Sequence, residues 1–117
     1  MIKEFILNKL NGRIKSVKHI KTKHDSVLDF VTVIFTGNNE GKKETHVFKL
    51  LAKDNVDEWY KITHYDDSMD KKAKSETRKE YPIDTSFKEH YPQTFNIDGK
   101  EYGIKWDIYD NDISEKF

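Results

Sequence analysis

Residues 27–53 read VLDFVTVIFTGNNEGKKETHVFKLLAK, and this stretch decides the fold. Six of the eleven residues from Val27 to Gly37 are Val, Ile or Thr, whose branched Cβ atoms suit a pleated strand. Both alternating faces of this segment are mostly apolar, which is typical of a strand covered on both sides. The Asn- and Gly-rich residues 37–41 suit a chain reversal. The stretch therefore predicts two long antiparallel strands joined by a hairpin at the centre of a sheet.

A second hairpin is predicted from residues 94–110, TFNIDGKEYGIKWDIYD. The Asp98-Gly99 pair is typical of a type I′ turn, which needs positive φ at both central residues. On the return strand the apolar residues fall on one face and the charged residues on the other. We expect the apolar face to be buried; it holds Tyr102, Ile104, Trp106 and Ile108.

The segments before and after the central hairpin are less distinctive. Residues 2–11 carry apolar side chains at helical spacing and are followed by Gly12, so they predict a short amphipathic helix. Residues 13–24 fit either a continued helix or a lysine-protected edge strand, and the glycine favours the strand. Residues 58–65, EWYKITHY, mix aromatic and β-branched residues and predict a third long strand.

Residues 66–80, DDSMDKKAKSETRKE, contain almost nothing to bury and predict a mobile charged insertion, either a loop or a solvated helix. Pro82 and Pro92 indicate irregular chain around Phe87 and Tyr91. With 117 residues, the chain is expected to form a single domain, residues 1–117. The predicted class is α+β: a short N-terminal helix packed on a curled antiparallel sheet of about five or six strands.

Residues 2–65 combine a short helix, the strand rhythm described above and the run Trp59-Tyr60-Lys61-Ile62. In these features the chain resembles small bacterial domains of the cystatin-like and nuclear-transport-factor-like folds. The resemblance implies a sheet wrapped around the helix. Members of these folds serve as protein-interaction modules, ligand pockets or, rarely, enzymes, so the resemblance implies a shape rather than one activity.

Composition narrows the classes of function. The chain lacks cysteine, which excludes a disulfide scaffold, a thiol nucleophile and a cysteine zinc site. No apolar run is long enough to predict a membrane span. The protein is expected in the cytoplasm if Met1 is the native start, and outside it if a leader was removed. The preference for lysine over arginine and the scarcity of alanine indicate an AT-rich genome, as in low-GC bacteria, phages and mobile elements.

No pattern predicts a catalytic residue, a metal site or a cofactor. The five histidines are scattered and complete no zinc pattern. The acidic residues near the C-terminus supply only a fragment of a calcium loop, without its central glycine. The serines lie in no nucleophile motif. The sequence therefore favours a protein that is not an enzyme, with an enzyme of the transport-factor-like type left open as an alternative.

Charge is balanced overall but unevenly spread. Residues 1–24 carry seven Lys or Arg against one Glu, whereas residues 81–117 carry four Lys against eight Asp or Glu. The basic segment suggests a surface for single-stranded nucleic acid, with nearby aromatics available for stacking. Its candidate residues are Lys15, Lys18, Lys21 and Lys23. The zero net charge weighs against this function, and edge protection or contact with a partner is the preferred explanation of the lysines.

Three functions remain open from the sequence. The first is a non-enzymatic module that binds another protein, or itself, through a sheet face or edge. The second is binding of single-stranded nucleic acid, and the third is a small-ligand pocket inside the sheet. An unpaired carboxylate is costly on an apolar strand face, which is where Asp29 is predicted to lie. We therefore expect either that the strand end at Asp29 is exposed to solvent or that Asp29 has a partner such as Lys18 or His46. The candidate interaction or pocket residues are Asp29, Trp59, Tyr60, His64 and Trp106.

Overall fold

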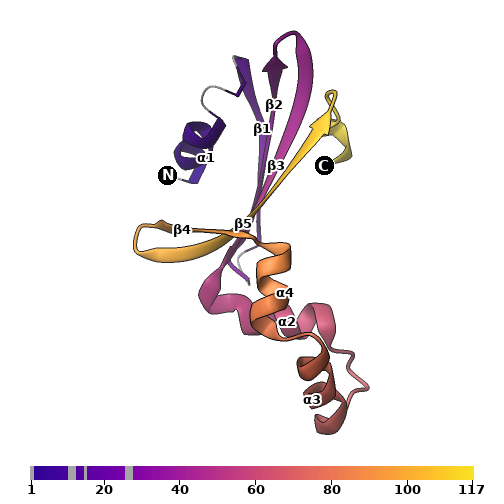
Figure 1. Ribbon diagram of the computed structural model, residues 1–117. Coiled ribbons are helices and arrows are strands. Elements are labelled where there is room, and N and C mark those ends of the chain that lie inside the picture. The colour runs from indigo at the N-terminus through magenta and orange to yellow at the C-terminus, as the bar shows by residue number, and fades with distance from the viewer. Residues whose placement is uncertain (1, 11–12, 15, 26–27) are drawn as a thin grey trace.

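A computed structural model describes residues 2–10, 13–14, 16–25 and 28–117. Within these ranges the chain forms one antiparallel sheet with strand order β1-β2-β3-β5-β4. Figure 1 shows α1 on one side of the strands and α2, α3 and α4 gathered at one end of the sheet. The predicted α+β class, with a short N-terminal helix and an antiparallel sheet, is confirmed. In chain order the elements are α1 (Ile2–Leu10), β1 (Ser16–Asp25), β2 (Phe30–Asn39), β3 (Lys42–Ala52), the 3₁₀ turn η1 (Lys53–Asn55), α2 (Val56–His64), α3 (Lys71–Glu80), α4 (Ile83–His90), β4 (Gln93–Ile97), β5 (Lys100–Asp110) and the 3₁₀ turn η2 (Ser114–Lys116).

Both predicted hairpins are confirmed. β2 and β3 pair without interruption from Phe30↔Leu51 to Asn39↔Lys42. Their two-residue turn has Glu40 and Gly41 at φ 52° and 82°, and the turn between β4 and β5 has Asp98 and Gly99 at 53° and 80°. Positive φ at both central residues matches the right-handed twist of the flanking strands. The local sequence therefore sets the register of both hairpins.

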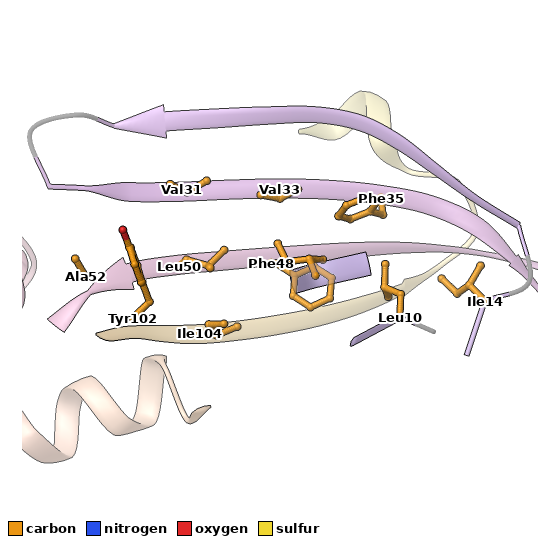
Figure 2. Close-up of a cluster of buried hydrophobic side chains, with 11 residues drawn as sticks. Leu10, Ile14, Val31, Val33, Phe35, Phe48, Leu50, Ala52, Tyr102 and Ile104 are labelled. Carbon is orange, nitrogen blue, oxygen red and sulfur yellow. The ribbon is translucent and has the colours of Figure 1, made fainter. Parts of the chain in front are cut away.

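One face of the sheet, here called the first face, is covered by α1. The alternating residues of β2, β3 and β5 supply the floor of this core, and Figure 2 shows them in rows along the three neighbouring strands. Ile6 and Leu10 of α1 are 0% and 1% exposed against it. Full burial of such a side chain contributes roughly 1.5–3 kcal/mol, so these two contacts fix the helix. The sheet residues of this core are Val31, Val33, Phe35, Phe48, Leu50, Ala52, Tyr102 and Ile104.

The opposite face, here called the second face, is covered at one end by α2 and α4. Towards its other end the segment after β5 lies against it, where Thr45 exchanges hydrogen bonds with the Asn111 carbonyl and the Ile113 N–H. A separate cluster there joins Leu51 of β3 to Trp59 and Tyr60 of α2 and to Phe87 and Tyr91. Close approach of α4 depends on Gly103 of β5. A Cβ atom at that position would lie 2.4 Å from Phe87 Cζ and 2.8 Å from Tyr91 Cβ. The glycine is therefore needed so that the helix can sit on the strand.

The prediction of a strand over residues 58–65 is wrong, because Val56–His64 is helix α2. Val56, Trp59, Tyr60 and His64 recur at i, i+3, i+4 and i+8, which puts them on one side of a helix. Burial of Trp59 and Tyr60 against the second face outweighs the β-propensity of the individual residues. The chain around Phe87 is likewise helix α4 rather than irregular, with Pro82 as its N-cap residue.

Two open expectations are resolved. Residues 16–25 form a strand, as favoured from the sequence. Residues 71–80 form helix α3, which buries none of its residues and is therefore the solvated helix rather than the loop. The Asp70 carboxylate caps α3 by accepting the Ala73 N–H at 2.8 Å. The run Trp59-Ile62, on which the resemblance to cystatin-like and transport-factor-like domains depends, lies in α2, and that resemblance stays a prediction.

Candidate functional site

A row of lysines crosses the second face. Directly opposed residues of antiparallel strands share a face, and the register pairs Lys23 with Thr32, Thr32 with Lys49, and Lys49 with Lys105. Leu51, on the same face of β3 as Lys49, belongs to the cluster under α2 and α4. The row therefore lies beside those helices, on the side away from α1. Lys21, opposite Ile34, adds a fourth lysine in the neighbouring row. We call Lys21, Lys23, Lys49 and Lys105 the lysine face.

These lysines are poorly neutralised. Among the residues that the structure describes, Lys21, Lys23 and Lys49 make no ion pair, and Lys105 has only Asp107, 3.8 Å from its Nζ. Like charges directly opposite each other destabilise a strand pair, and Lys49 faces Lys105. Lysines on edge strands discourage stray pairing, but β3 and β5 are internal strands. Edge protection therefore does not explain this pair.

A cavity of about 340 Å³ opens where the lysine face meets α2 and α4. Its floor is formed by Lys49 and Lys105, and its walls come from the two helices and the residue after α4. We call it the helix pocket. It is lined by Lys49, Trp59, Thr63, His64, His90, Tyr91 and Lys105.

The walls of the helix pocket are held by ring contacts and hydrogen bonds. Trp59 packs edge-on against His64 and His90, with centroids 5.8 and 5.4 Å apart. His64 also stacks on Tyr60 at 4.3 Å, and its Nε2 lies 3.1 Å from Ser86 Oγ. Burial raises the pKa of Tyr91 to about 12, so its hydroxyl is neutral at physiological pH. The pocket is therefore a fixed aromatic and imidazole wall above two ammonium groups.

Ser86 and His64 do not form an evident nucleophilic pair. The Ser86 side chain is buried at 4% exposure. The other ring nitrogen of His64, Nδ1, lies 2.7 Å from the hydroxyl of Thr63 rather than from a carboxylate. Catalytic histidines are oriented by a third group that stabilises the imidazolium, and a neutral hydroxyl does so poorly. The contact is better explained as mutual hydrogen-bond satisfaction between α2 and α4.

Of the four lysines suggested for nucleic-acid binding, Lys18, Lys21 and Lys23 lie on β1 and, by their partners on β2, share the second face. A register shift between His19 and Lys21 keeps Lys18 on the same side as the other two. Lys15 lies outside the described residues. The structure joins Lys21 and Lys23 to Lys49 and Lys105, which sequence reasoning missed.

Asp29 lies just before β2 with φ 48°, and its partners are not the expected Lys18 or His46. Its carboxylate accepts a hydrogen bond from Lys100 Nζ, with further contacts to the Tyr102 hydroxyl at 3.4 Å and to His24 Nε2 at 3.5 Å. The Lys100 hydrogen bond, followed by those of His24 and Tyr102, holds the pKa of Asp29 below its ordinary value despite some desolvation. Asp29 thus joins the start of β2 to the start of β5.

The polar groups of Trp106 and Tyr60 are hydrogen-bonded within the protein. The Trp106 indole N–H donates to His46 Nδ1 at 2.8 Å, so His46 Nε2 carries the proton and donates to Glu44 at 2.8 Å. Burial, partly offset by Glu44, lowers the pKa of His46, which is fully buried on the first face. The Tyr60 hydroxyl donates to the Tyr81 carbonyl at 2.5 Å and anchors α2 to the end of α3. Of the five candidate interaction residues, Trp59 and His64 alone line the helix pocket.

Within the described ranges, no group of three or more His, Asp or Glu side chains is arranged to hold a metal ion. No described helix is both long and apolar enough to cross a membrane. No protein-family model matches the chain, and neither the curated proteins nor the solved structures gave a match to it.

Proposed function

We propose that the protein is a non-enzymatic interaction module that holds an acidic segment of a partner protein on the lysine face. The supporting observation is the facing pair Lys49 and Lys105 on internal strands, where two like charges cost stability and protect no edge. Repulsion between like charges that destabilises the free protein is expected at a binding site, where an oppositely charged ligand relieves the repulsion. Carboxylates of a bound segment would do so.

A protein partner fits the surroundings of the lysine face better than a nucleic acid does. A single strand needs several open ring faces on which successive bases stack. Trp59, Tyr60 and Tyr91 are 8%, 0% and 6% exposed, which leaves contact with one small group at the helix pocket but no platform for a run of bases. The chain as a whole carries no net charge, unlike most nucleic-acid-binding domains.

The test compares two anionic probes on the same protein. Fluorescein-labelled poly-glutamate peptide and a labelled thymidine oligonucleotide are titrated by anisotropy at low and moderate ionic strength. The peptide is expected to bind, with an affinity that falls as salt rises. The variant K21E/K23E should weaken peptide binding about tenfold or more, since each reversal replaces an attraction of about 1 kcal/mol by repulsion.

The matched control is K71E/K72E, which makes the same charge change on exposed α3, away from the lysine face. It should leave peptide affinity within about twofold, which is under 0.5 kcal/mol. Equal losses in the two variants, or no peptide binding at low salt, would overturn the proposal. Tighter binding of the oligonucleotide than of the peptide, with the same sensitivity to K21E/K23E, would replace it by the nucleic-acid function.

A further inference from the structure

The helix pocket differs from the rest of the lysine face because it is enclosed on one side by rings. Lys49 and Lys105 form its floor, and both are only half-exposed. Lys49 and Lys105 lie directly opposite each other on neighbouring strands. The floor of the pocket therefore presents two positive charges side by side to an anion.

The donor groups at the pocket suit an anion with several acceptor atoms. Each lysine offers three N–H donors and no acceptor. His90 also lines the wall, whereas both ring nitrogens of His64 already have partners in Ser86 and Thr63. A carboxylate carries one negative charge and two oxygens, whereas a phosphate monoester carries −1.5 to −2 and three strong acceptor oxygens. The phosphate matches the two facing ammonium groups in charge better than a carboxylate does, and Asp107, 3.8 Å from Lys105 Nζ, neutralises them only in part.

The size and walls of the pocket indicate more than a bare inorganic ion. Its volume of about 340 Å³ equals that of roughly eleven water molecules at about 30 Å³ each, so it has room for an organic group beside the phosphate. Trp59 and Tyr91 line the wall above the lysines and offer apolar contact to such a group. Ligand pockets of this kind combine aromatic walls with a few well-placed polar groups.

We propose that the helix pocket is a binding site for a phosphate monoester, with Lys49 and Lys105 holding the phosphoryl oxygens and Trp59 and Tyr91 contacting the organic group. The phosphoryl group could be that of a free small molecule or of a phosphorylated side chain in the acidic partner. The site does not require that partner, so it can exist even if the proposed function fails.

The two tryptophans of the chain make the test internally controlled. Trp59 lines the pocket, whereas the Trp106 indole is hydrogen-bonded to His46 in the first-face core. In ¹H–¹⁵N spectra of the whole protein titrated with phenyl phosphate, the Trp59 indole signal should shift saturably and the Trp106 signal should stay in place. K49Q/K105Q should weaken binding at least tenfold, whereas K42Q, at the exposed start of β3, should leave it unchanged.

Further probes separate the ligand classes. Phenyl phosphate should bind more tightly than inorganic phosphate, which lacks the organic group, and than benzoate, which lacks the dianion. A phosphotyrosine peptide that binds more tightly than phenyl phosphate would assign the phosphoryl group to a partner side chain; equal or weaker binding would assign it to a free small molecule. No Trp59 shift, equal shifts of both indoles, or unchanged binding by K49Q/K105Q would overturn the site. Because the poly-glutamate experiment uses K21E/K23E, its failure is distinguishable from failure here.

Discussion

Replacing Lys49 by Gln should stabilise the free protein. Lys49 lies directly opposite Lys105 and has no ion pair among the described residues, whereas Lys105 keeps Asp107 at 3.8 Å. Lys49→Gln therefore removes the repulsion with little accompanying loss. Glutamine keeps most of the side-chain length, so packing on the second face changes little.

The expected magnitude follows from the cross-strand geometry. Opposed Cβ atoms lie about 4.5–5.5 Å apart, and two outward-reaching ammonium groups are then on the order of 8 Å apart. Their repulsion is about 0.5 kcal/mol in bulk water and about 2 kcal/mol at an effective dielectric constant near 20. Exposure and salt favour the lower value. We expect Lys49→Gln to raise the free energy of unfolding by roughly 0.5–1 kcal/mol.

A double-mutant cycle isolates the pairwise part of this effect. Urea unfolding is measured for the wild type, K49Q, K105Q and K49Q/K105Q, with K42Q as a control, because Lys42 is opposite uncharged Asn39. The gain from K49Q should disappear in the K105Q background, since the repelling partner is then absent. The gain should also shrink at high salt. A neutral or destabilising K49Q, or strictly additive effects, would refute the repulsion on which the lysine face depends.

Three further predictions concern the scaffold and are checked by urea unfolding. Gly103→Ala should lower the free energy of unfolding by about 1–3 kcal/mol or more, because the added Cβ would lie 2.4 Å from Phe87 Cζ. An unchanged urea midpoint would mean that α4 does not sit on β5. Leu10→Ala should lower the free energy of unfolding by about 2–5 kcal/mol, since Leu10 of α1 is 1% exposed against the first face. A loss below about 1 kcal/mol would contradict that packing. Asp29→Asn should weaken the fall of the free energy of unfolding at acid pH. The pKa of Asp29 is lowered in the folded protein, so the stabilisation by its carboxylate is full above pH about 4 and is lost as pH falls through the folded pKa. The same acid dependence in Asp29→Asn and wild type would exclude the Lys100 contact.

Much of the scaffold could be predicted because its signals are local. The pair Asp98-Gly99 and the two-residue alternation across residues 30–52 each depend on near neighbours, and both hairpins formed as expected. The sequence of α2 predicts a strand because Trp59, Tyr60 and Thr63 favour strands individually. Its helical spacing becomes decisive only when the second face is available to bury Trp59 and Tyr60.

The candidate site could be predicted only in part. Lys21 and Lys23 were singled out as part of a basic segment. Lys49 and Lys105 lie far along the chain and look like ordinary exposed residues of alternating strands. They join the others only through the register of three strand pairs, which sequence alone does not give. His90 and Tyr91 could not be predicted as part of the site because the sequence around α4 predicts irregular chain.

The most direct test of the lysine face is lysine acetylation footprinting by mass spectrometry, with and without saturating poly-glutamate. The bound peptide should slow acetylation of Lys21, Lys23, Lys49 and Lys105 together. It should leave the exposed lysines of α1 and α3, such as Lys3 and Lys72, unchanged. Protection of Lys3 and Lys72 equal to that of the four face residues, or protection of the β1 lysines without Lys49 and Lys105, would contradict a binding surface that spans the sheet.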